Sequence, residues 1–389
     1  MSRDLIVFAI TLFTWGIGES MFFIFQPLYL QELGASPLEI GTILGSMGIA
    51  MAVAHIPAGY LSDRLGRRPL IWTAWLLGLV AAWIMALGRA LPIFIAGMLL
   101  YNLTAFVSSP MNSYITAARG ELSIGRVLTF ISASYNAGAI IGPWLGGLIA
   151  ENFSLGTIYS VSASIFFVSC LIVLFLRPQP TDHHEEHQGG HKVAIFNSRL
   201  ITYLGVTFLA MFAMYLPQVL APNFLQNERG LNYSQIGQLG SISGIGIVLL
   251  NLALGALNAR TGFLLGQVAM LAYALLLWQG REYGLFALAY ALIGGFRVAR
   301  SLAIAQIRNL ARQSQMGLVY GINETVAAST VILAPPLAGW IYSKNPVMIF
   351  LVSAALILIS ILVSARLLPG LTQQRPITST TELPDKPIC

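Results

Sequence analysis

The sequence carries very little charge. Only 9% of its 389 residues are Asp, Glu, Lys or Arg, whereas 56% are hydrophobic and the mean hydropathy is +0.75. In a soluble globular domain about a quarter of the residues are charged. This composition excludes an ordinary soluble protein and predicts a chain with many membrane spans.

Cysteine is almost absent, and recognisable catalytic motifs are missing. Cys170 lies in an apolar run and Cys389 is the last residue, so the sequence has no disulfide framework. It has no G-x-x-x-x-G-K-[ST] phosphate loop and no H-E-x-x-H, and no paired catalytic acids lie in a span. We therefore expect neither an enzyme nor an ATP-driven pump, and neither a cofactor nor a metal.

Long apolar runs dominate the chain instead. A span needs about 20 mostly apolar residues. Twelve segments qualify, and we interpret the first as a retained helix rather than a signal peptide. The segments are 5–29, 38–61, 70–88, 92–117, 127–150, 156–176, 200–224, 235–257, 263–279, 284–307, 317–342 and 347–367.

The basic residues indicate how the chain crosses the membrane. With the N-terminus inside, fifteen of the 21 Lys and Arg residues fall in cytoplasmic segments and four fall outside. Arg297 and Arg300 are the remaining two and lie within a span. The bias predicts a multi-pass protein of the inner (plasma) membrane with both termini in the cytoplasm. In this setting the net charge of +6 implies no nucleic acid partner.

One long polar insert follows the sixth span and divides the chain in two. It contains His183, His184, Glu185, Glu186, His187 and His191. A metal site is one interpretation of that spacing, but nearby glycines and prolines favour a solvated linker. We expect a first bundle at 1–176, a linker at 177–198, a second bundle at 199–370 and a tail at 371–389.

The two halves repeat each other. Ile40-Gly41 recurs as Ile236-Gly237, and Gly59-x-Leu61-x-x-Arg64-x-Gly66 recurs as Gly255-x-Leu257-x-x-Arg260-x-Gly262, both at an offset of 196. Pro143-x-x-x-Gly147 matches Pro335-x-x-x-Gly339 at 192. Such a duplication predicts two related bundles of six helices each.

A decapeptide between the second and third spans holds four charges in ten residues. It reads Gly59-Tyr60-Leu61-Ser62-Asp63-Arg64-Leu65-Gly66-Arg67-Arg68. Charges are costly in hydrocarbon, so we expect a tight hairpin in water at the cytoplasmic face, with its turn at Gly66.

This decapeptide resembles the G-x-L-S-D-R-x-G-R-R signature of the major facilitator superfamily (MFS) of secondary transporters. The resemblance implies an all-α membrane fold of twelve helices in two pseudo-symmetric bundles that rock about a central site. It also implies a conformational latch that holds the cytoplasmic ends of the two halves together when the other side is open. The latch residues would be Gly59, Asp63, Arg64, Gly66, Arg67 and Arg68.

Glu19 lies within the first span. A carboxylate at that depth must be protonated, paired or facing water, which makes it a candidate for proton coupling. A static ion pair between the halves is the alternative. The first helix of each three-helix unit lines the cavity in the superfamily that this chain resembles, which favours coupling.

Arg297 and Arg300 are one turn apart in the tenth span, and arginine keeps its charge in proteins. Their depths predict that Arg300 and Glu324 form a buried ion pair and that Arg297 faces the cavity. There Arg297 would engage either Glu19 or an anionic group of the substrate.

The fifth span contains glycines at a spacing that lets a neighbouring helix pack closely. The helix-packing motif is Gly138, Gly142, Pro143, Gly146 and Gly147. It resembles a motif typical of proton-driven antiporters in this superfamily, although Thr129 replaces one glycine of the longer form. The fourth span departs from that pattern, because Met98 stands where such antiporters often carry arginine.

The remaining substrate-binding candidates are polar or aromatic side chains within the spans. For each polar one alone, an ordinary hydrogen bond between helices is the competing explanation. The candidates are Trp15, Phe22, Tyr101, Asn102, Asn112, Tyr135, Asn136, Tyr215, Gln218 and Arg297, with Asn251 as a further polar liner.

These observations predict a monomeric secondary transporter that uses the proton gradient to export a small amphipathic or aromatic compound. One alternative is an uptake symporter or uniporter for an organic anion or a sugar-like solute. Another, of a different class, is a receptor or assembly factor on a transporter scaffold that transports nothing.

Overall fold

The computed structural model describes residues 2–179, 198–307 and 316–372. Within these ranges only the backbone is described for residues 56–65, 316–318 and 369–372. The histidine-containing linker and the C-terminal tail lie outside the described residues, so the metal interpretation of the linker stays untested.

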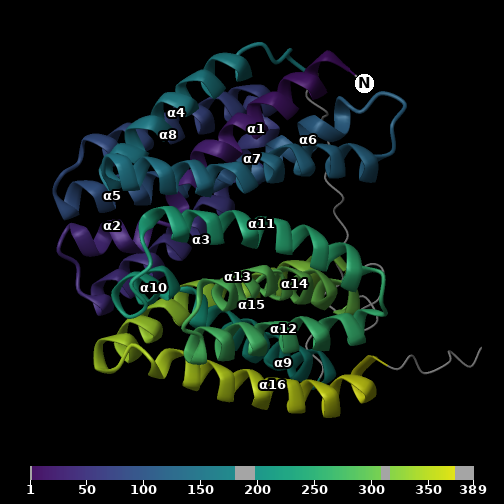
Figure 1. Cartoon of the computed structure of the whole chain (residues 1–389). Coiled ribbons are helices and arrows are strands. Elements are labelled where there is room, and N and C mark those ends of the chain that lie inside the picture. Colours follow the sequence, from purple (N-terminus) through teal and green to yellow (C-terminus); the bar gives the residue numbers. More distant parts are fainter. Residues whose placement is uncertain (1, 180–197, 308–315, 373–389) are drawn as a thin grey trace, which may run out of the picture.

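The first bundle holds the helices before the linker (Figure 1). They are α1 (Arg3–Phe23), α2 (Gln26–Glu32), α3 (Pro37–Leu65), α4 (Arg67–Leu87), α5 (Leu91–Leu103), the 3-10 helix η1 (Thr104–Val107), α6 (Ser108–Ala117), α7 (Ile124–Asn152) and α8 (Leu155–Val173).

The second bundle repeats the order after the linker. Its helices are α9 (Ser198–Tyr215), the 3-10 helix η2 (Leu216–Gln218), α10 (Ala221–Asn227), α11 (Tyr233–Gly255), α12 (Ala259–Gln279), α13 (Tyr283–Leu292), α14 (Gly294–Ile307), α15 (Met316–Lys344) and α16 (Met348–Thr372).

In the part of the chain that the structure describes, twelve helical segments are long and apolar enough to cross a membrane, and they coincide with the twelve predicted spans to within a few residues. No strand occurs in the described ranges. The predicted fold class is therefore confirmed. In hydrocarbon a backbone must satisfy its own hydrogen bonds, and helices do so within each span.

Four spans are interrupted near the middle or toward one end. The breaks fall between α1 and α2, at η1, at η2, and between α13 and α14. Pro27, Pro110 and Pro217 lie at or just after three of them, and a glycine pair follows the fourth. Proline has no amide hydrogen and its ring disturbs the preceding turn, so the helix breaks there.

The polar decapeptide forms the expected tight hairpin between two helices. The helix α3 continues through its first seven residues as far as Leu65, and α4 begins at Arg67. Gly66 makes the turn, with φ of 79°, a value that favours glycine. The predicted turn at Gly66 is therefore confirmed.

The closest packing inside the first bundle is between α1 and α7. A Cβ added at Gly138 would meet the carbonyl oxygen of Phe13, and one added at Gly146 would meet that of Met21. The glycine stripe therefore brings two backbones into direct contact.

The largest contacts between the two bundles are made by two pairs of helices that are related by the internal repeat. The helix α3 packs on α15, and α7 packs on α11. A Cβ at Gly41 would meet Pro335 and Gly339, while a Cβ at Gly237 would meet Pro143 and Gly147. Gly41 and Gly237 are equivalent positions of the repeat at an offset of 196, and Pro143 and Gly147 are equivalent to Pro335 and Gly339 at 192. The interface is therefore pseudo-symmetric.

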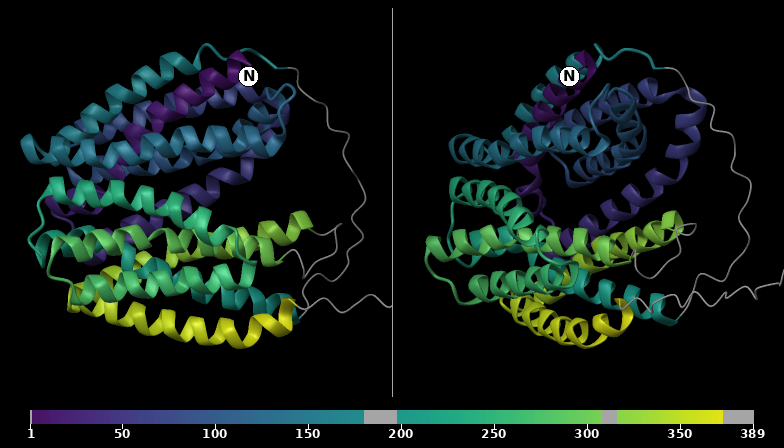
Figure 2. Two further views of the ribbon diagram at one scale, coloured as in Figure 1. Left: turned by 45° about the vertical axis from the view of Figure 1, so that its right-hand side comes forward. Right: turned by 90° about the vertical axis from the view of Figure 1, so that its right-hand side faces the viewer.

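These contacts close one end of the molecule. We call it the far end; it contains Gln31, Gly34 and Asn227, whereas the linker end contains the N-terminus and Gln179. In the left view of Figure 2, α7 of the upper layer and α11 of the lower layer diverge toward the end that carries the N-terminus. Among the described residues, every hydrogen bond between the bundles lies in the far half of the molecule.

Candidate functional site

Glu19 is bound by tyrosines of its own bundle. The hydroxyl of Tyr135, on α7, donates to Glu19 Oε2 at 2.6 Å. The Tyr101 hydroxyl, on α5, is also hydrogen-bonded to the Glu19 carboxyl group. Because Tyr101 accepts from Trp15 Nε1 at 3.1 Å, its own proton is free to point at Glu19. Three helices thus position one half-buried carboxyl group.

Arg297 faces this carboxyl group from the second bundle. Its guanidinium is close enough to act electrostatically on Glu19, Tyr135 and Tyr215. It does not form a direct ion pair with Glu19, and its side chain is exposed although it lies within a span. The Glu19 carboxyl group and the Arg297 guanidinium therefore face each other from the two halves without forming an ion pair.

Arg300 and Glu324 form an ion pair between α14 and α15, with Nη2 of Arg300 donating to Oε2 of Glu324 at 2.6 Å. The expectation that this pair is buried is wrong, since the two side chains are 37% and 44% exposed. Glu324 lies three helical turns before Pro335, on the face of α15 that contacts α3 at the far end. Where the bundles diverge, that face looks into the space between them.

Two aromatic candidates lie deeper than predicted. Phe22 is completely buried, and Trp15 stacks on Phe166 with ring centroids 4.0 Å apart. Phe22 also packs edge-on against Tyr101 and Phe166. In this conformation both rings pack against Tyr101 from behind and neither faces open space, so their expected contact with the substrate stays a prediction.

Some of the other candidates bond only to their own helix. Asn102 Nδ2 donates to the Met98 carbonyl oxygen at 2.9 Å, and Gln218 Nε2 donates to that of Met214 at 2.8 Å. Asn251 does the same to Ile247 at 2.8 Å. Each of these amide groups therefore donates to the backbone of its own span and makes no described hydrogen bond to Glu19, Tyr101 or Tyr135.

The remaining candidates differ in how closely they approach the centre. Asn136, next to Tyr135 on α7, is exposed and donates to the Ser132 carbonyl oxygen. Asn112, on α6, is also exposed. Tyr215 packs against Phe296, the residue before Arg297, with ring centroids 5.7 Å apart. Of these three, Tyr215 is the one that the structure places beside Arg297.

The latch residues are described only in part. Only the backbone is described at Gly59, Asp63 and Arg64, so the expected role of these residues stays a prediction. Arg67 Nη1 donates to Gln179 Oε1 at 3.4 Å, and the Arg68 guanidinium lies 3.9 Å from the centre of the Trp72 ring.

The glycine motif of α7 serves two interfaces. Gly138, Gly142 and Gly146 pack on α1, whereas Pro143 and Gly147 contact α11 of the second bundle. The motif therefore joins the helix that carries Glu19 to the contact between the two halves.

Sequence reasoning missed a polar clasp at the far end. Gln31 Oε1 accepts from Asn223 Nδ2 at 2.7 Å and from Asn227 Nδ2 at 3.0 Å. Asn223 Nδ2 also donates to the Pro27 carbonyl oxygen at 3.1 Å. Gln31 and Asn227 are 196 residues apart, as are Pro27 and Asn223. The repeat offset was the signal that could have found the clasp, since equivalent residues meet on a two-fold axis.

The family model for the Major Facilitator Superfamily matches residues 8–206 and 203–388. Multidrug resistance protein 2 of Bacillus subtilis is 22% identical over 359 residues, which are 87% of this chain and 89% of that protein. Multidrug resistance protein MdtG of Salmonella arizonae is 27% identical over 275 residues, covering 67% and 68%. An uncharacterised MFS-type transporter of Methanocaldococcus jannaschii is 29% identical over 175 residues, 44% of its length.

Solved structures share the fold at low identity. The nucleoside transporter NupG superposes with a TM-score of 0.79 at 15% identity, covering 96% of this chain and all of that one. A peptide transporter, POT, superposes with a TM-score of 0.78 at 12% identity, covering 95% of each chain.

Proposed function

The chain belongs to the Major Facilitator Superfamily, and from this premise we propose that it exports a small amphipathic or aromatic organic compound in exchange for protons. Membership makes it a multi-pass membrane transporter. The two relatives that match most of the chain are both multidrug resistance proteins, which supports export as the direction.

The observation that carries proton coupling is the position of Glu19. Its carboxyl group accepts a hydrogen bond from the Tyr135 hydroxyl at 2.6 Å. The positive charge of Arg297 acts on the same carboxyl group across the interface. A carboxyl group held by phenolic donors can exist with or without its proton, and an approaching cation favours the charged form. Movement of Arg297 relative to Glu19 would therefore link the bundle motion to proton binding and release.

This arrangement also accounts for the absence of an arginine in the fourth span. Met98 stands at that place and is fully buried, and the cation that faces Glu19 is Arg297 of α14 in the other half. The distance between the Glu19 carboxyl group and the Arg297 guanidinium would then change whenever the two bundles rock.

The conformation supports alternating access. The far end is closed by the clasp and the glycine contacts, and the helices diverge toward the linker end. The excess of basic residues would place the linker end in the cytoplasm, so this conformation would be the inward-facing one. The protein would act as a monomer in an inner or plasma membrane, with the proton gradient as its energy source.

The test is transport by purified protein in proteoliposomes under an imposed pH gradient, with Glu19→Gln as the variant. We expect Glu19→Gln to lose proton-driven accumulation while keeping substrate counterflow, because the neutral amide still binds but cannot exchange a proton. Glu324→Gln is the matched control, since it removes a carboxylate of the same opening that already has a salt-bridge partner. If Glu19→Gln still concentrates substrate against its gradient, coupling through this residue is wrong.

The same preparation decides the direction of transport. If the protein exchanges substrate for protons, substrate loaded inside the vesicles should leave faster when the proton concentration is higher outside than inside. Uptake of an organic anion by symport would instead run with the protons, and a receptor that transports nothing would show no flux in either arrangement.

A further inference from the structure

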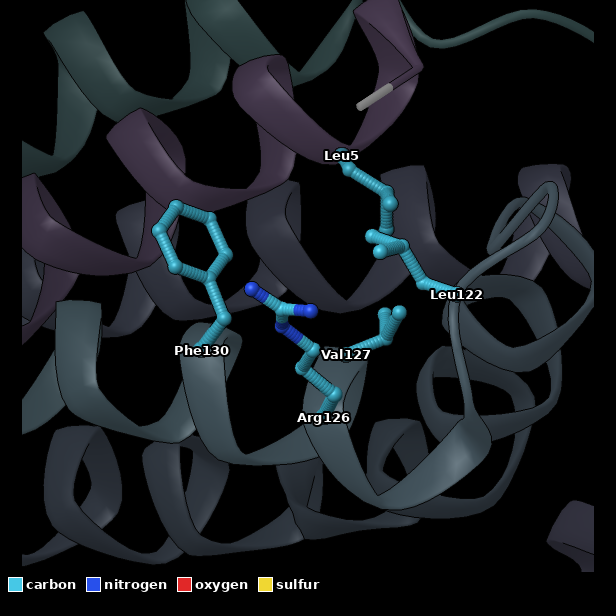
Figure 3. A pocket seen from close by; sticks show the side chains of 5 residues that line it. All are labelled: Leu5, Leu122, Arg126, Val127 and Phe130. Atoms are coloured by element: carbon cyan, nitrogen blue, oxygen red, sulfur yellow. The ribbon is translucent and has the colours of Figure 1, made fainter.

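A cavity of about 280 Å³ lies between the first turns of α1 and α7, away from the Glu19 cluster. It is lined by Leu5, Leu122, Arg126, Val127 and Phe130. Four of these five side chains are apolar, and the fifth carries a permanent positive charge. Figure 3 shows the Arg126 side chain directed toward α1, between Phe130 and Leu122.

The guanidinium of Arg126 has no partner among the residues that the structure describes. Its backbone amide is satisfied by Ser123 Oγ, but no hydrogen bond, ion pair or ring contact engages its side chain. The first turn of α7 contains no acidic residue, so the positive end of the helix dipole adds to the same charge. Arg126 is exposed beside these apolar groups, so its guanidinium is available to bind an anion.

The cavity between α1 and α7 is bordered by Phe130, which lies on the side of α7 that faces away from the α1 and α11 contacts. Phe130, Ile141 and Trp144 are exposed along that side, and they are large apolar residues of a membrane-spanning helix. Gly138 and Gly142 face α1, and Gly147 faces α11. This third side is therefore in contact with lipid, and Arg126 lies where the span begins, at the level of the headgroups.

We propose that this cavity binds an anionic phospholipid of the leaflet at the linker end. Its phosphate pairs with the Arg126 guanidinium, which offers the planar donor pair that matches phosphate oxygens. One acyl chain lies along Val127 and Phe130 and covers Leu5. A lipid is the occupant that supplies both a fixed negative charge and an apolar tail at this depth.

Lipid bound here would bridge the helix that carries Glu19 and the helix that carries Tyr135. Both α1 and α7 line the cavity, and the same two helices make the tightest glycine contact of the first bundle. Binding would therefore stabilise the folded bundle by mass action, because the unfolded chain has no such cavity.

The test measures thermal unfolding of the full chain in a mild detergent, titrated with phosphatidylglycerol or with phosphatidylcholine. We expect phosphatidylglycerol to raise the midpoint more than phosphatidylcholine does. Arg126→Gln should weaken the apparent affinity for phosphatidylglycerol about tenfold, the size expected for losing one charge-assisted hydrogen bond. Arg126→Lys should recover part of the loss.

Arg199→Gln is the matched control, because Arg199 is an exposed arginine in the first turn of α9 at the same end of the molecule and lines no such cavity. Phe130→Ala should weaken the response to both lipids without removing the preference for phosphatidylglycerol. Equal responses of wild type and Arg126→Gln would overturn the proposal. So would stabilisation by glycerol phosphate alone to the same extent, since the site would then bind a free anion and no lipid.

Discussion

At the scale of single residues, the proposed coupling site is a carboxyl group whose environment comes from several helices. Tyr135 and Tyr101 hold Glu19 from one bundle, and Arg297 approaches it from the other. Arg300 and Glu324, in contrast, form a direct ion pair with each other. Because that pair is more than a third exposed, its contribution to stability is that of a solvated salt bridge, about 0–1 kcal/mol.

Tyr135→Phe tests the hydrogen bond to Glu19. A bond to a charged acceptor contributes about 1.5–3 kcal/mol, so we expect proton-driven transport to fall about tenfold or more while the protein stays folded. Tyr159→Phe is the control, because the Tyr159 hydroxyl is buried in the same bundle without a hydrogen-bond partner. The measurement is the initial rate of transport in proteoliposomes across a range of pH. Equal losses in the two variants would contradict a specific role of Tyr135.

At the scale of elements, the interrupted spans and the glycine stripe decide where the site forms. Tyr101 precedes η1, Tyr215 precedes η2, and Arg297 follows the break between α13 and α14 by one turn. Glu19 lies about a turn before the break that follows α1. Broken helices are tolerated within a membrane where they line a cavity, and here they gather the polar groups at similar depth.

Gly138→Ala tests the contact between α1 and α7. The added methyl group would meet the backbone of Phe13 and Ile17, which cannot move aside as a side chain can. We expect a loss of about 1–3 kcal/mol in the free energy of unfolding. Gly205→Ala, in the middle of α9 with nothing near its Cβ, should instead stabilise by about 0.4–1 kcal/mol. Unfolding midpoints in detergent measure both, and a neutral Gly138→Ala would refute close backbone packing.

At the scale of the whole molecule, the closed far end is a pseudo-symmetric surface. Gly41 meets α15 as Gly237 meets α7, and Gln31 meets its own repeat equivalent, Asn227. Such an interface has two similar halves. It closes the far side of the Glu19 site and leaves the linker side open.

A cross-link at the clasp tests whether this end must open. With Cys170 and Cys389 replaced by serine, Gln31→Cys and Asn227→Cys would place two thiols across the interface, where a short bifunctional reagent can join them. We expect the cross-link to stop transport, and cleavage of a reducible reagent to restore it. The same reagent on Ser154→Cys and Thr157→Cys, a pair within the first bundle, should leave transport intact. Transport that survives the clasp cross-link would exclude alternating access through the far end.

The amino-acid sequence alone determined the twelve spans, the division into two bundles and the repeat. These follow from local requirements: apolar side chains for hydrocarbon and helices that satisfy their own backbone. The sequence also located Glu19, Arg297 and the pair of Arg300 with Glu324, because charge within a span is costly and therefore conspicuous.

Only the tertiary structure decided which of these groups meet, and in what environment. Whether Phe22 faces a cavity or a core, whether the Arg300 pair is buried, and that Tyr135 is the donor to Glu19 depend on how each helix is rotated and how closely its neighbours pack. The sequence of an apolar span indicates its rotation only weakly, because an apolar side chain is equally stable against lipid and against the protein interior. The closed far end depends, in addition, on the relative position of two bundles that share one sequence pattern.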